Sequence, residues 1–279
     1  MNSRNNRGYP HVMTDQRHIM LKVAKKRVEN DHFATLFFDH ALEFSPGQFV
    51  MLWIPGVDEK PYTVSYHSAD QFAVTIEAKG LFSNRAVTLD SGDLVGIRGP
   101  FGNGFTIKKD QRTAVVAGGC GMAPLAPLVD TLAHDDIFIH GARSKAYILY
   151  PDRFGLQREF CTDDGSLGKK GFVTDLLTAR IESGDPIDMV YTCGPEIMMY
   201  HIFQICEKHG IACQVSLERY MRCGFGVCGA CVCSDQVVCK DGPVFGSDRI
   251  RQMTDFNRTA LLKSGKEVPL EDYFSWRCK

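Results

Sequence analysis

Short apolar runs separated by turn residues fill the first third of the chain. The runs are rich in aromatic and β-branched residues, which favour extended backbone. Turn signals such as Ser45-Pro46-Gly47 and Ser91-Gly92-Asp93 fall between them. Several short strands at this spacing predict a small antiparallel barrel or sandwich. The expected strands cover residues 18–23, 33–39, 49–54, 62–66, 72–76 and 94–98.

After residue 109 the pattern changes to apolar strand, glycine-rich turn and helix. A strand over 113–117 leads into Gly118-Gly119-Cys120-Gly121, and a helical stretch over 125–133 follows. Such alternation predicts a parallel sheet that is covered by helices on both faces. Further strands of this sheet are expected over 137–140, 146–150 and 189–192.

These patterns divide the chain into three parts and a tail. We expect an antiparallel β-barrel domain over residues 12–109 and a parallel α/β domain over 110–215. Residues 216–246 form a small module around a cysteine cluster, and residues 247–279 form the tail. The tail mixes charges with several large aromatic side chains, which is too apolar for a disordered segment. We therefore expect it to pack on its own chain or on a partner.

Composition and charge narrow the class of protein. With 279 residues, of which 44% are apolar and 23% charged, the chain resembles a globular protein of two ordinary domains. The 32 Lys and Arg residues nearly balance the 33 Asp and Glu residues, so no net field attracts nucleic acid or an anionic membrane. No apolar run reaches the roughly 20 residues that cross a bilayer, and the polar start with Arg4 and Arg7 is unlike a signal peptide. We expect a cytoplasmic protein that binds neither nucleic acid nor membrane.

The eleven cysteines are distributed unevenly. Seven are scattered along the chain, whereas four are grouped at regular spacing: Cys223, Cys228, Cys231 and Cys239. The first three show the C-x4-C-x2-C spacing of plant-type [2Fe–2S] sites, in which the fourth thiolate comes later in the chain. Glycines between them allow the tight loop that such a cluster requires. The sequence therefore predicts a [2Fe–2S] cluster rather than a disulfide framework.

Two alternatives remain for this region. Cys233 competes with Cys239 as fourth ligand, but it follows Cys231 by two residues in an expected strand and would be separated from it along the strand. A structural zinc site normally uses two C-x2-C pairs, and this segment has one such pair, Cys228 with Cys231.

The glycine-rich turn at Gly118–Gly121 is a candidate phosphate site. Backbone amides at a strand-to-helix turn bind a pyrophosphate, although similar turns also occur without a ligand. Two further segments fall at the ends of expected strands, where open α/β sheets bind ligands: Thr162-Asp163-Asp164-Gly165-Ser166 and Thr192-Cys193-Gly194-Pro195-Glu196. The acidic pair Asp163–Asp164 suits ribose hydroxyls and repels a 2′-phosphate, which favours NAD over NADP.

A second candidate lies in the expected barrel. Lys60-Pro61-Tyr62-Thr63-Val64-Ser65 offers a cation, an aromatic face and hydroxyls in one extended stretch. A flavin ring stacks on an aromatic side chain, a hydroxyl hydrogen-bonds near its N5 atom, and a lysine meets its diphosphate. On these residues alone, an ordinary edge strand with an exposed lysine is the simpler interpretation.

The order of the motifs resembles the ferredoxin–NADP reductase superfamily. Besides the segments above, the chain carries Lys79-Gly80-Leu81-Phe82-Ser83, Gly99-Pro100-Phe101-Gly102-Asn103-Gly104-Phe105 and Cys239-Lys-Asp-Gly-Pro-Val-Phe245. More closely, residues 12–246 resemble the electron-transfer subunits of NAD-dependent (class B) dihydroorotate dehydrogenases. Two positions depart from the superfamily pattern: Lys60 stands where arginine is usual, and Cys120 where threonine is usual.

The resemblance implies a cofactor for each part: FAD in the barrel, NAD in the α/β domain and the [2Fe–2S] cluster in the C-terminal module. It implies electron transfer in pyrimidine biosynthesis to a separate FMN-containing catalytic subunit, within a hetero-oligomer. By motif, Lys60, Pro61, Tyr62 and Thr63 would contact FAD, and Gly80 with Ser83 would hold its diphosphate. Gly119, Cys120, Gly121 and Asp163 would meet the nicotinamide nucleotide, and Cys193 with Gly194 would lie by its nicotinamide ring.

No acid–base dyad is expected, because hydride exchange between NAD(H) and FAD requires positioning more than proton transfer. Within the same class, the chain also resembles flavoprotein subunits of sulfide dehydrogenases, bifurcating transhydrogenases and cytosolic hydrogenases. Transhydrogenase-type subunits commonly have Asp as first cluster ligand, so Cys223 favours the dihydroorotate system. The alternative from another class is a binding module with a zinc staple and no nucleotide.

Overall fold

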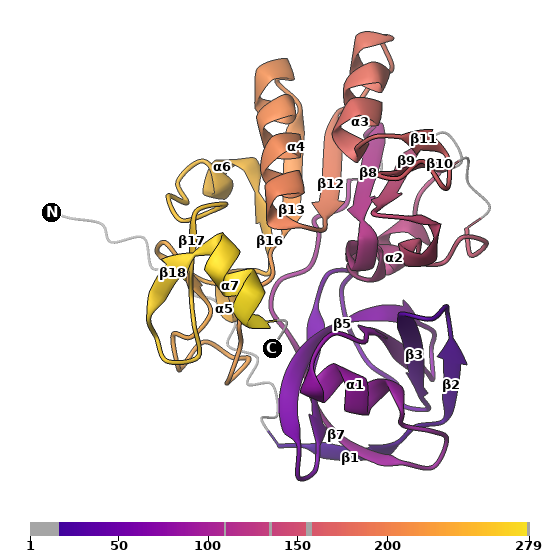
Figure 1. Ribbon diagram of the computed structural model, residues 1–279, viewed down its shortest axis with the longest axis vertical. Coiled ribbons are helices and arrows are strands. Elements are labelled where there is room, and N and C mark those ends of the chain that lie inside the picture. Colours follow the sequence, from indigo (N-terminus) through magenta and orange to yellow (C-terminus); the bar gives the residue numbers. More distant parts are fainter. Residues whose placement is uncertain (1–16, 109, 134–135, 155–157, 278–279) are drawn as a thin grey trace, which may run out of the picture.

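The computed structural model describes residues 17–108, 110–133, 136–154 and 158–277. Figure 1 shows an antiparallel β-domain below, an α/β domain above it, and the C-terminal segments at the side of both. The expected polar N-terminus and Cys278 lie outside the described residues. Within the described ranges, no helix has both the length and the apolar character needed to cross a membrane.

The β-domain is one curled antiparallel sheet with the strand order β1-β7-β4-β5-β6-β3-β2. Strand β3, which lies between β6 and the edge strand β2, is buried along its whole length, and the short helix α1 places Phe82 and Ala86 in the same core. The predicted antiparallel barrel is therefore confirmed. Its elements are β1 (Ile19–Lys22), β2 (Lys25–Val28), β3 (Phe33–Phe38), β4 (Phe49–Ile54), β5 (Asp58–His67), β6 (Phe72–Glu77), α1 (Leu81–Val87) and β7 (Leu94–Phe101).

The α/β domain contains a sheet with the order β11-β10-β9-β8-β12-β13-β16. Alternate residues of β8 enter two different cores: Val115 packs with α2, whereas Val116 packs with α3 and α4. Helices on both faces were predicted and are confirmed. The elements are β8 (Thr113–Gly118), η1 (Gly119–Gly121), α2 (Met122–Val129), β9 (Ile137–Ala142), η2 (Lys145–Tyr147), β10 (Arg158–Thr162), β11 (Lys169–Lys170), α3 (Val173–Glu182), β12 (Met189–Cys193), α4 (Glu196–His209) and β13 (Ala212–Ser216).

The strand expected over 146–150 is wrong. This segment begins with the short helix η2, and Tyr150 has a positive φ of 54°. Its apolar residues are buried against the barrel, where the Tyr150 hydroxyl bonds to Thr75 and Asn30 donates to the Ile148 carbonyl. Burial between two domains thus produced the apolar run, and the next strand of the sheet is β10.

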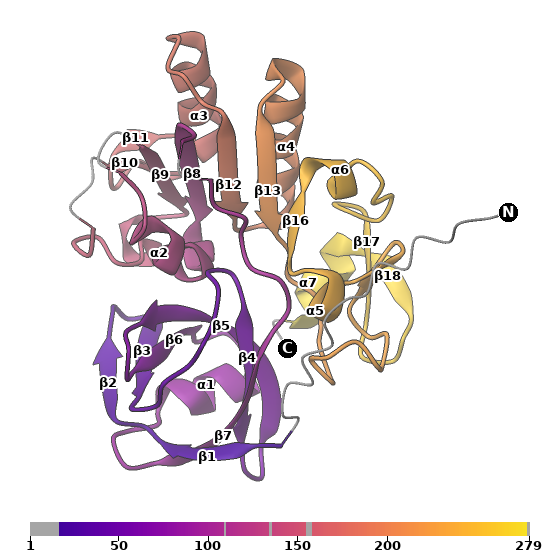
Figure 2. The same ribbon diagram turned by 180° about the vertical axis from the view of Figure 1, so that it is seen from behind.

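The C-terminal segments are joined to the α/β sheet. Strand β16 pairs antiparallel with β13, so the cysteine-rich module extends this sheet at its edge (Figure 2). The tail packs on its own chain, as one of the two expected alternatives: Tyr273 is fully buried, and Tyr220 and Trp276 lie against the same cluster. The elements are β14 (Val232–Cys233), β15 (Gln236–Val237), α5 (Val238–Asp241), β16 (Val244–Gly246), α6 (Ser247–Ile250), β17 (Thr259–Leu261), β18 (Glu267–Pro269) and α7 (Leu270–Arg277).

Candidate functional site

The expected nucleotide segments lie at one edge of the parallel sheet. Parallel pairing aligns Cys193 with Ala117, Gly118 with Gly141, and Thr162 with Ala142. The neighbouring strands β10, β9, β8 and β12 therefore end at one edge of the sheet, where open α/β sheets bind ligands. The turn after β8, the segment at Asp163 and the turn after Cys193 all follow this edge.

The glycines of the Gly118–Gly121 turn have two different roles. A Cβ on Gly121 would lie 2.2 Å from the Cys193 carbonyl oxygen, and one on Gly118 would lie 2.5 Å from the Met198 sulfur. These two glycines let the turn pack against the β12 end. Gly119 has a φ of +52° and its Cβ position faces open space. Gly119 is thus the glycine whose bare backbone is open to a ligand.

Asp163 and Asp164 are both exposed, but they differ in their contacts. The Asp164 carboxylate accepts hydrogen bonds from the Ser166 backbone N–H (2.9 Å) and hydroxyl (2.6 Å), which lower its pKa. Asp164 therefore shapes the turn, and Asp163 is the better candidate for a ribose contact. Strand β11 carries Lys169 and Lys170 and pairs with the end of β10 at Cys161 and Thr162. Two positively charged residues therefore lie at the same edge as the acidic pair.

The expected flavin residues come together on β5 and α1. The rings of Tyr62 and Phe82 stack with centroids 6.1 Å apart, which brings β5 next to the start of α1. The Ser83 hydroxyl accepts hydrogen bonds of 2.9 Å from the backbone N–H groups of Lys79 and Gly80. Lys60 forms an ion pair with Asp58, and its ammonium lies 5.7 Å from the Tyr220 ring centroid.

Helix α2, which follows the glycine turn, packs against β5, so the two candidate nucleotide sites adjoin. Charged and thiol side chains from both domains converge there. Glu77 and Lys79 form an ion pair of 2.7 Å beside Cys120, and Glu218 acts electrostatically on both Cys120 and Cys193. Burial and then Glu218 raise the pKa of both thiols. A raised pKa favours the neutral thiol, which is a weaker nucleophile than the thiolate.

Sequence reasoning missed Glu77 and Glu218. Glu77 ends β6 and Glu218 follows β13 by two residues, so each is a polar residue at a strand end. That position was the only available signal. Nothing in the local sequence relates a barrel residue to one that lies 141 positions later (218 − 77).

The cysteine loop has the backbone that its glycines predict. Gly224, Gly226 and Gly229 all have a positive φ, between 67° and 89°. A Cβ on Gly224 would lie 2.8 Å from Met51, so the close approach of loop and barrel also requires glycine there.

The sulfurs of this loop receive several backbone hydrogen bonds. The N–H of Gly226 donates to Cys239 (3.1 Å), that of Cys239 to Cys231 (3.3 Å), and that of Val227 to Cys223 (3.4 Å). Burial would raise the pKa of Cys223, but backbone N–H donors at Cys228, Phe225 and Val227 lower it to about 6. Such donors stabilise thiolates, the form that binds iron.

The four thiols form two hydrogen-bonded pairs, Cys223 with Cys228 and Cys231 with Cys239. They do not form one closed ligand set: in the described ranges, no three His, Cys, Asp or Glu side chains meet as a metal site. The donor set and the N–H groups directed at the sulfurs nevertheless fit a [2Fe–2S] cluster. Cys233 points elsewhere, because its sulfur accepts a 3.3 Å hydrogen bond from Arg219.

The cysteine loop is fixed to the barrel rather than to the α/β domain alone. Asn103, just after β7, donates from its side chain to the carbonyl oxygens of Lys240 (3.2 Å) and Asp241 (2.9 Å). The Phe101 ring lies 6.4 Å from that of Phe225 in the loop. The cysteine module therefore contacts the barrel at the end of β7.

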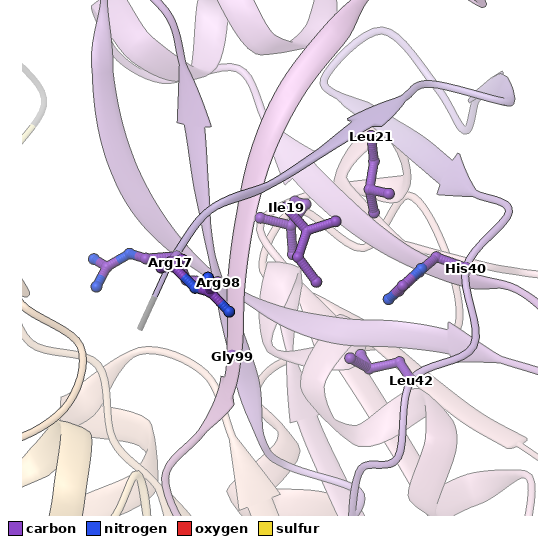
Figure 3. A pocket seen from close by; sticks show the side chains of 8 residues that line it. Arg17, Ile19, Leu21, His40, Leu42, Arg98 and Gly99 are labelled. Carbon is purple, nitrogen blue, oxygen red and sulfur yellow. The ribbon is translucent and has the colours of Figure 1, made fainter. Parts of the chain in front are cut away.

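A separate hollow opens at the edge of the barrel (Figure 3). Ile19 and Leu21 of β1 face His40 and Leu42 across it, and Arg98 lies at one end. None of the predicted cofactor residues lines this hollow.

Two family models match the chain. Residues 218–251 match the iron-sulfur cluster binding domain of dihydroorotate dehydrogenase B, and residues 115–204 match an oxidoreductase NAD-binding domain. The first match contains all four thiols of the loop. The second contains the glycine turn, Asp163 and Cys193.

Known structures share the fold. The NADH-dependent reduced ferredoxin-NADP oxidoreductase, studied for flavin-based electron bifurcation, superposes with a TM-score of 0.75 at 25% identity, over 92% of this chain and 98% of that one. A ferredoxin NADP+ reductase from Neisseria gonorrhoeae with bound FAD and NADP gives a TM-score of 0.58 at 18% identity, over 70% and 92% of the two chains. The second likeness concerns the fold alone.

Curated relatives are much closer in sequence. A protein of Methanocaldococcus jannaschii named "Probable dihydroorotate dehydrogenase B (NAD(+)), electron transfer subunit" is 41% identical over 86% of this chain and 94% of its own length. A protein of the same name from Methanocella arvoryzae is 42% identical over 82% and 89% of the two chains. The chain therefore belongs to the family of electron transfer subunits of dihydroorotate dehydrogenase B.

Proposed function

We propose that this protein is the electron-transfer subunit of an NAD-dependent dihydroorotate dehydrogenase of pyrimidine biosynthesis. It moves electrons between NAD(H), FAD and a [2Fe–2S] cluster and exchanges them with an FMN-containing catalytic subunit in a hetero-oligomer. The family membership and the match at residues 218–251 support this function. A cytoplasmic location agrees with the use of cysteines as thiolate ligands, because thiols stay reduced there.

The observation that carries the proposal is the shared position on the barrel of the nucleotide turn and the thiol loop. Helix α2 of the α/β domain packs on β5 of the barrel, and Asn103, just after the last barrel strand, contacts the cysteine module. When bound, FAD exchanges hydride with NAD(H), and the cluster carries single electrons. The chain's own part is to hold these groups close together and to exclude water around the buried Cys193.

We assign roles to residues on the same basis. Lys60, Pro61, Tyr62 and Thr63 hold the flavin with Gly80 and Ser83; Gly119, Cys120, Gly121, Asp163, Cys193 and Gly194 hold the nicotinamide nucleotide; Cys223, Cys228, Cys231 and Cys239 bind the cluster. Residues 12–109, 110–215 and 216–246 form the corresponding domains, and β16 of the last one completes the sheet of the second.

The surface of the thiol loop supports transfer to a partner. Val227 is 76% exposed, and its neighbour Cys228 is exposed as well. A cluster at this loop would therefore lie near the molecular surface, where an electron can pass to another subunit.

The test is anaerobic purification of the chain with its bound partners. We expect flavin absorption bands, a broad cluster spectrum with two irons per chain, and a co-purified FMN protein that oxidises dihydroorotate. A colourless protein that contains zinc would falsify the electron-transfer function and favour a binding module.

The likeness to the bifurcating oxidoreductase supports a second candidate, a subunit that passes electrons between nicotinamide nucleotides and a low-potential carrier. The co-purified partner separates the two candidates. A partner without dihydroorotate activity that reduces NADP with ferredoxin would favour the second.

A further inference from the structure

A buried ion pair connects the start of α4, next to the Cys193 turn, with the cysteine module. The side chains of Arg219 and Glu196 are 1% and 3% exposed, and they make a bidentate contact. The Nη2 atom of Arg219 donates to Oε1 of Glu196 at 2.8 Å, and Nη1 donates to Oε2. Burial of a bidentate pair fixes both charges in position.

Further hydrogen bonds hold each partner. Oε1 of Glu196 also accepts the backbone N–H of Asn257 in the tail at 2.7 Å. Arg219 donates in addition to the Glu218 carbonyl oxygen (2.9 Å) and to the Cys233 sulfur (3.3 Å). The guanidinium is therefore turned towards the cysteine module, whereas the carboxylate sits at the start of α4, just after the Cys193 turn.

The cationic end of the pair lies near the thiol ligands. Arg219 precedes Cys223 by four residues, and Cys233 follows Cys231 by two. Two residues of chain span at most roughly 7 Å, so the guanidinium, which contacts Cys233, lies on the order of 10 Å or less from Cys231. Charges at this separation interact strongly where water is excluded.

We propose that the Arg219–Glu196 pair sets the reduction potential of the cluster, a role that rests on the proposed function. Reduction adds one negative charge to the cluster. A fixed guanidinium on its side favours the reduced form, and the carboxylate behind it limits this effect. The pair acts through its charges and does not touch the reacting atoms.

Opposite shifts from the two partners test this role. Glu196→Gln leaves the guanidinium uncompensated, so we expect the midpoint potential of the cluster to rise, with a change on the order of tenfold in the one-electron equilibrium constant. Arg219→Gln should lower the potential by a similar factor. The double variant should return towards the wild-type value, because both charges are then absent. Redox titration followed by electron paramagnetic resonance measures all three.

A matched control exists on the same helix. Arg251 makes a bidentate pair with Glu207 of α4, but this pair is exposed and has no contact with the cysteine module among its hydrogen bonds. Arg251→Gln should leave the potential unchanged. Arg219→Lys, which keeps the charge, should stay close to wild type.

Shifts in the same direction for both partners, or no shifts, would overturn the proposal, because loosened structure alone has no reason to reverse sign. If Arg219→Gln does not fold, Glu196→Gln decides by itself, and an unchanged or lowered potential rejects the idea. A wild-type protein without a cluster signal would instead overturn the proposed function.

Discussion

The backbone N–H of Asn103 donates a hydrogen bond of 2.6 Å to the carbonyl oxygen of Gly242. Asn103 follows the last barrel strand and Gly242 follows α5, so the bond joins the barrel to the cysteine module. The position of the thiol loop against the barrel depends on this hydrogen bond.

Gly102→Ala should break the junction. Gly102 has a φ of +75°, and its Cβ would lie 2.6 Å from the Gly242 oxygen. We expect a loss of about 3 kcal/mol in unfolding free energy and slower transfer to acceptors beyond the cluster. Gly56→Ala is the control: its φ is +77°, but its Cβ faces open space, so only the backbone cost of about 1 kcal/mol remains. Denaturant titration compares the two, and equal losses would contradict the junction.

Cys228→Ser should remove the cluster and leave flavin chemistry intact. Electron transfer from NADH to an artificial two-electron acceptor should continue through FAD, whereas transfer through the cluster should stop. Iron content and visible absorption report the cluster directly. Cys233→Ser is the matched control and should keep the iron, because Cys233 contacts Arg219 instead of the other thiols. If Cys233→Ser lost its iron and Cys228→Ser kept it, Cys233 rather than Cys228 would be a ligand of the cluster.

Gly119→Ala and Gly121→Ala should fail in different ways. The new methyl at 119 faces open space, so only the backbone cost of a positive φ, about 1 kcal/mol, is expected. The methyl nevertheless occupies the side from which a nucleotide approaches. We expect the KM for NADH to rise about tenfold, which corresponds to ~1.4 kcal/mol. At 121 the Cβ would lie 2.2 Å from the Cys193 oxygen, so thermal stability should fall as well. Unchanged KM values in Gly119→Ala would place the nucleotide elsewhere.

NADH should be preferred to NADPH, and Asp163 should carry the preference. Asp163→Asn should reduce the ratio of kcat/KM for the two nucleotides about tenfold, the size of one hydrogen bond to a charged group. Asp164→Asn is the control, because its carboxylate is engaged by Ser166. A larger change in the control would assign the ribose contact to Asp164.

Acid should destabilise the protein through His140. Burial is the main cause that lowers the pKa of His140 from 6.5 to about 4. Between these values the unfolded chain binds a proton that the folded chain does not, so stability is complete above pH 6.5 and declines as the pH falls towards 4. The loss amounts to about 3 kcal/mol. Urea unfolding across this range measures it, and His140→Phe should flatten the slope; an unchanged slope would contradict the assignment.

Much of the fold and of the candidate site follows from local sequence. The strands before residue 109 and the change to an α/β pattern after it are set by side-chain periodicity, which is a property of neighbouring residues. The spacing of Cys223, Cys228 and Cys231 and the glycines between them indicate the cluster in the same way. The apolar run at 146–150 led to a wrong strand prediction, because burial between domains and burial in a strand select the same apolar side chains.

The tertiary structure decided what those segments face. The sequence determined the presence of a glycine-rich turn after a strand, an extended Lys60–Ser65 segment and a thiol loop, because each needs particular residues at short spacing. It could not determine that Glu77 and Glu218 both act electrostatically on Cys120, or that Arg219 pairs with Glu196 and donates a hydrogen bond to Cys233. Such contacts arise from the way separately formed surfaces fit together, and no local pattern along the chain encodes that fit.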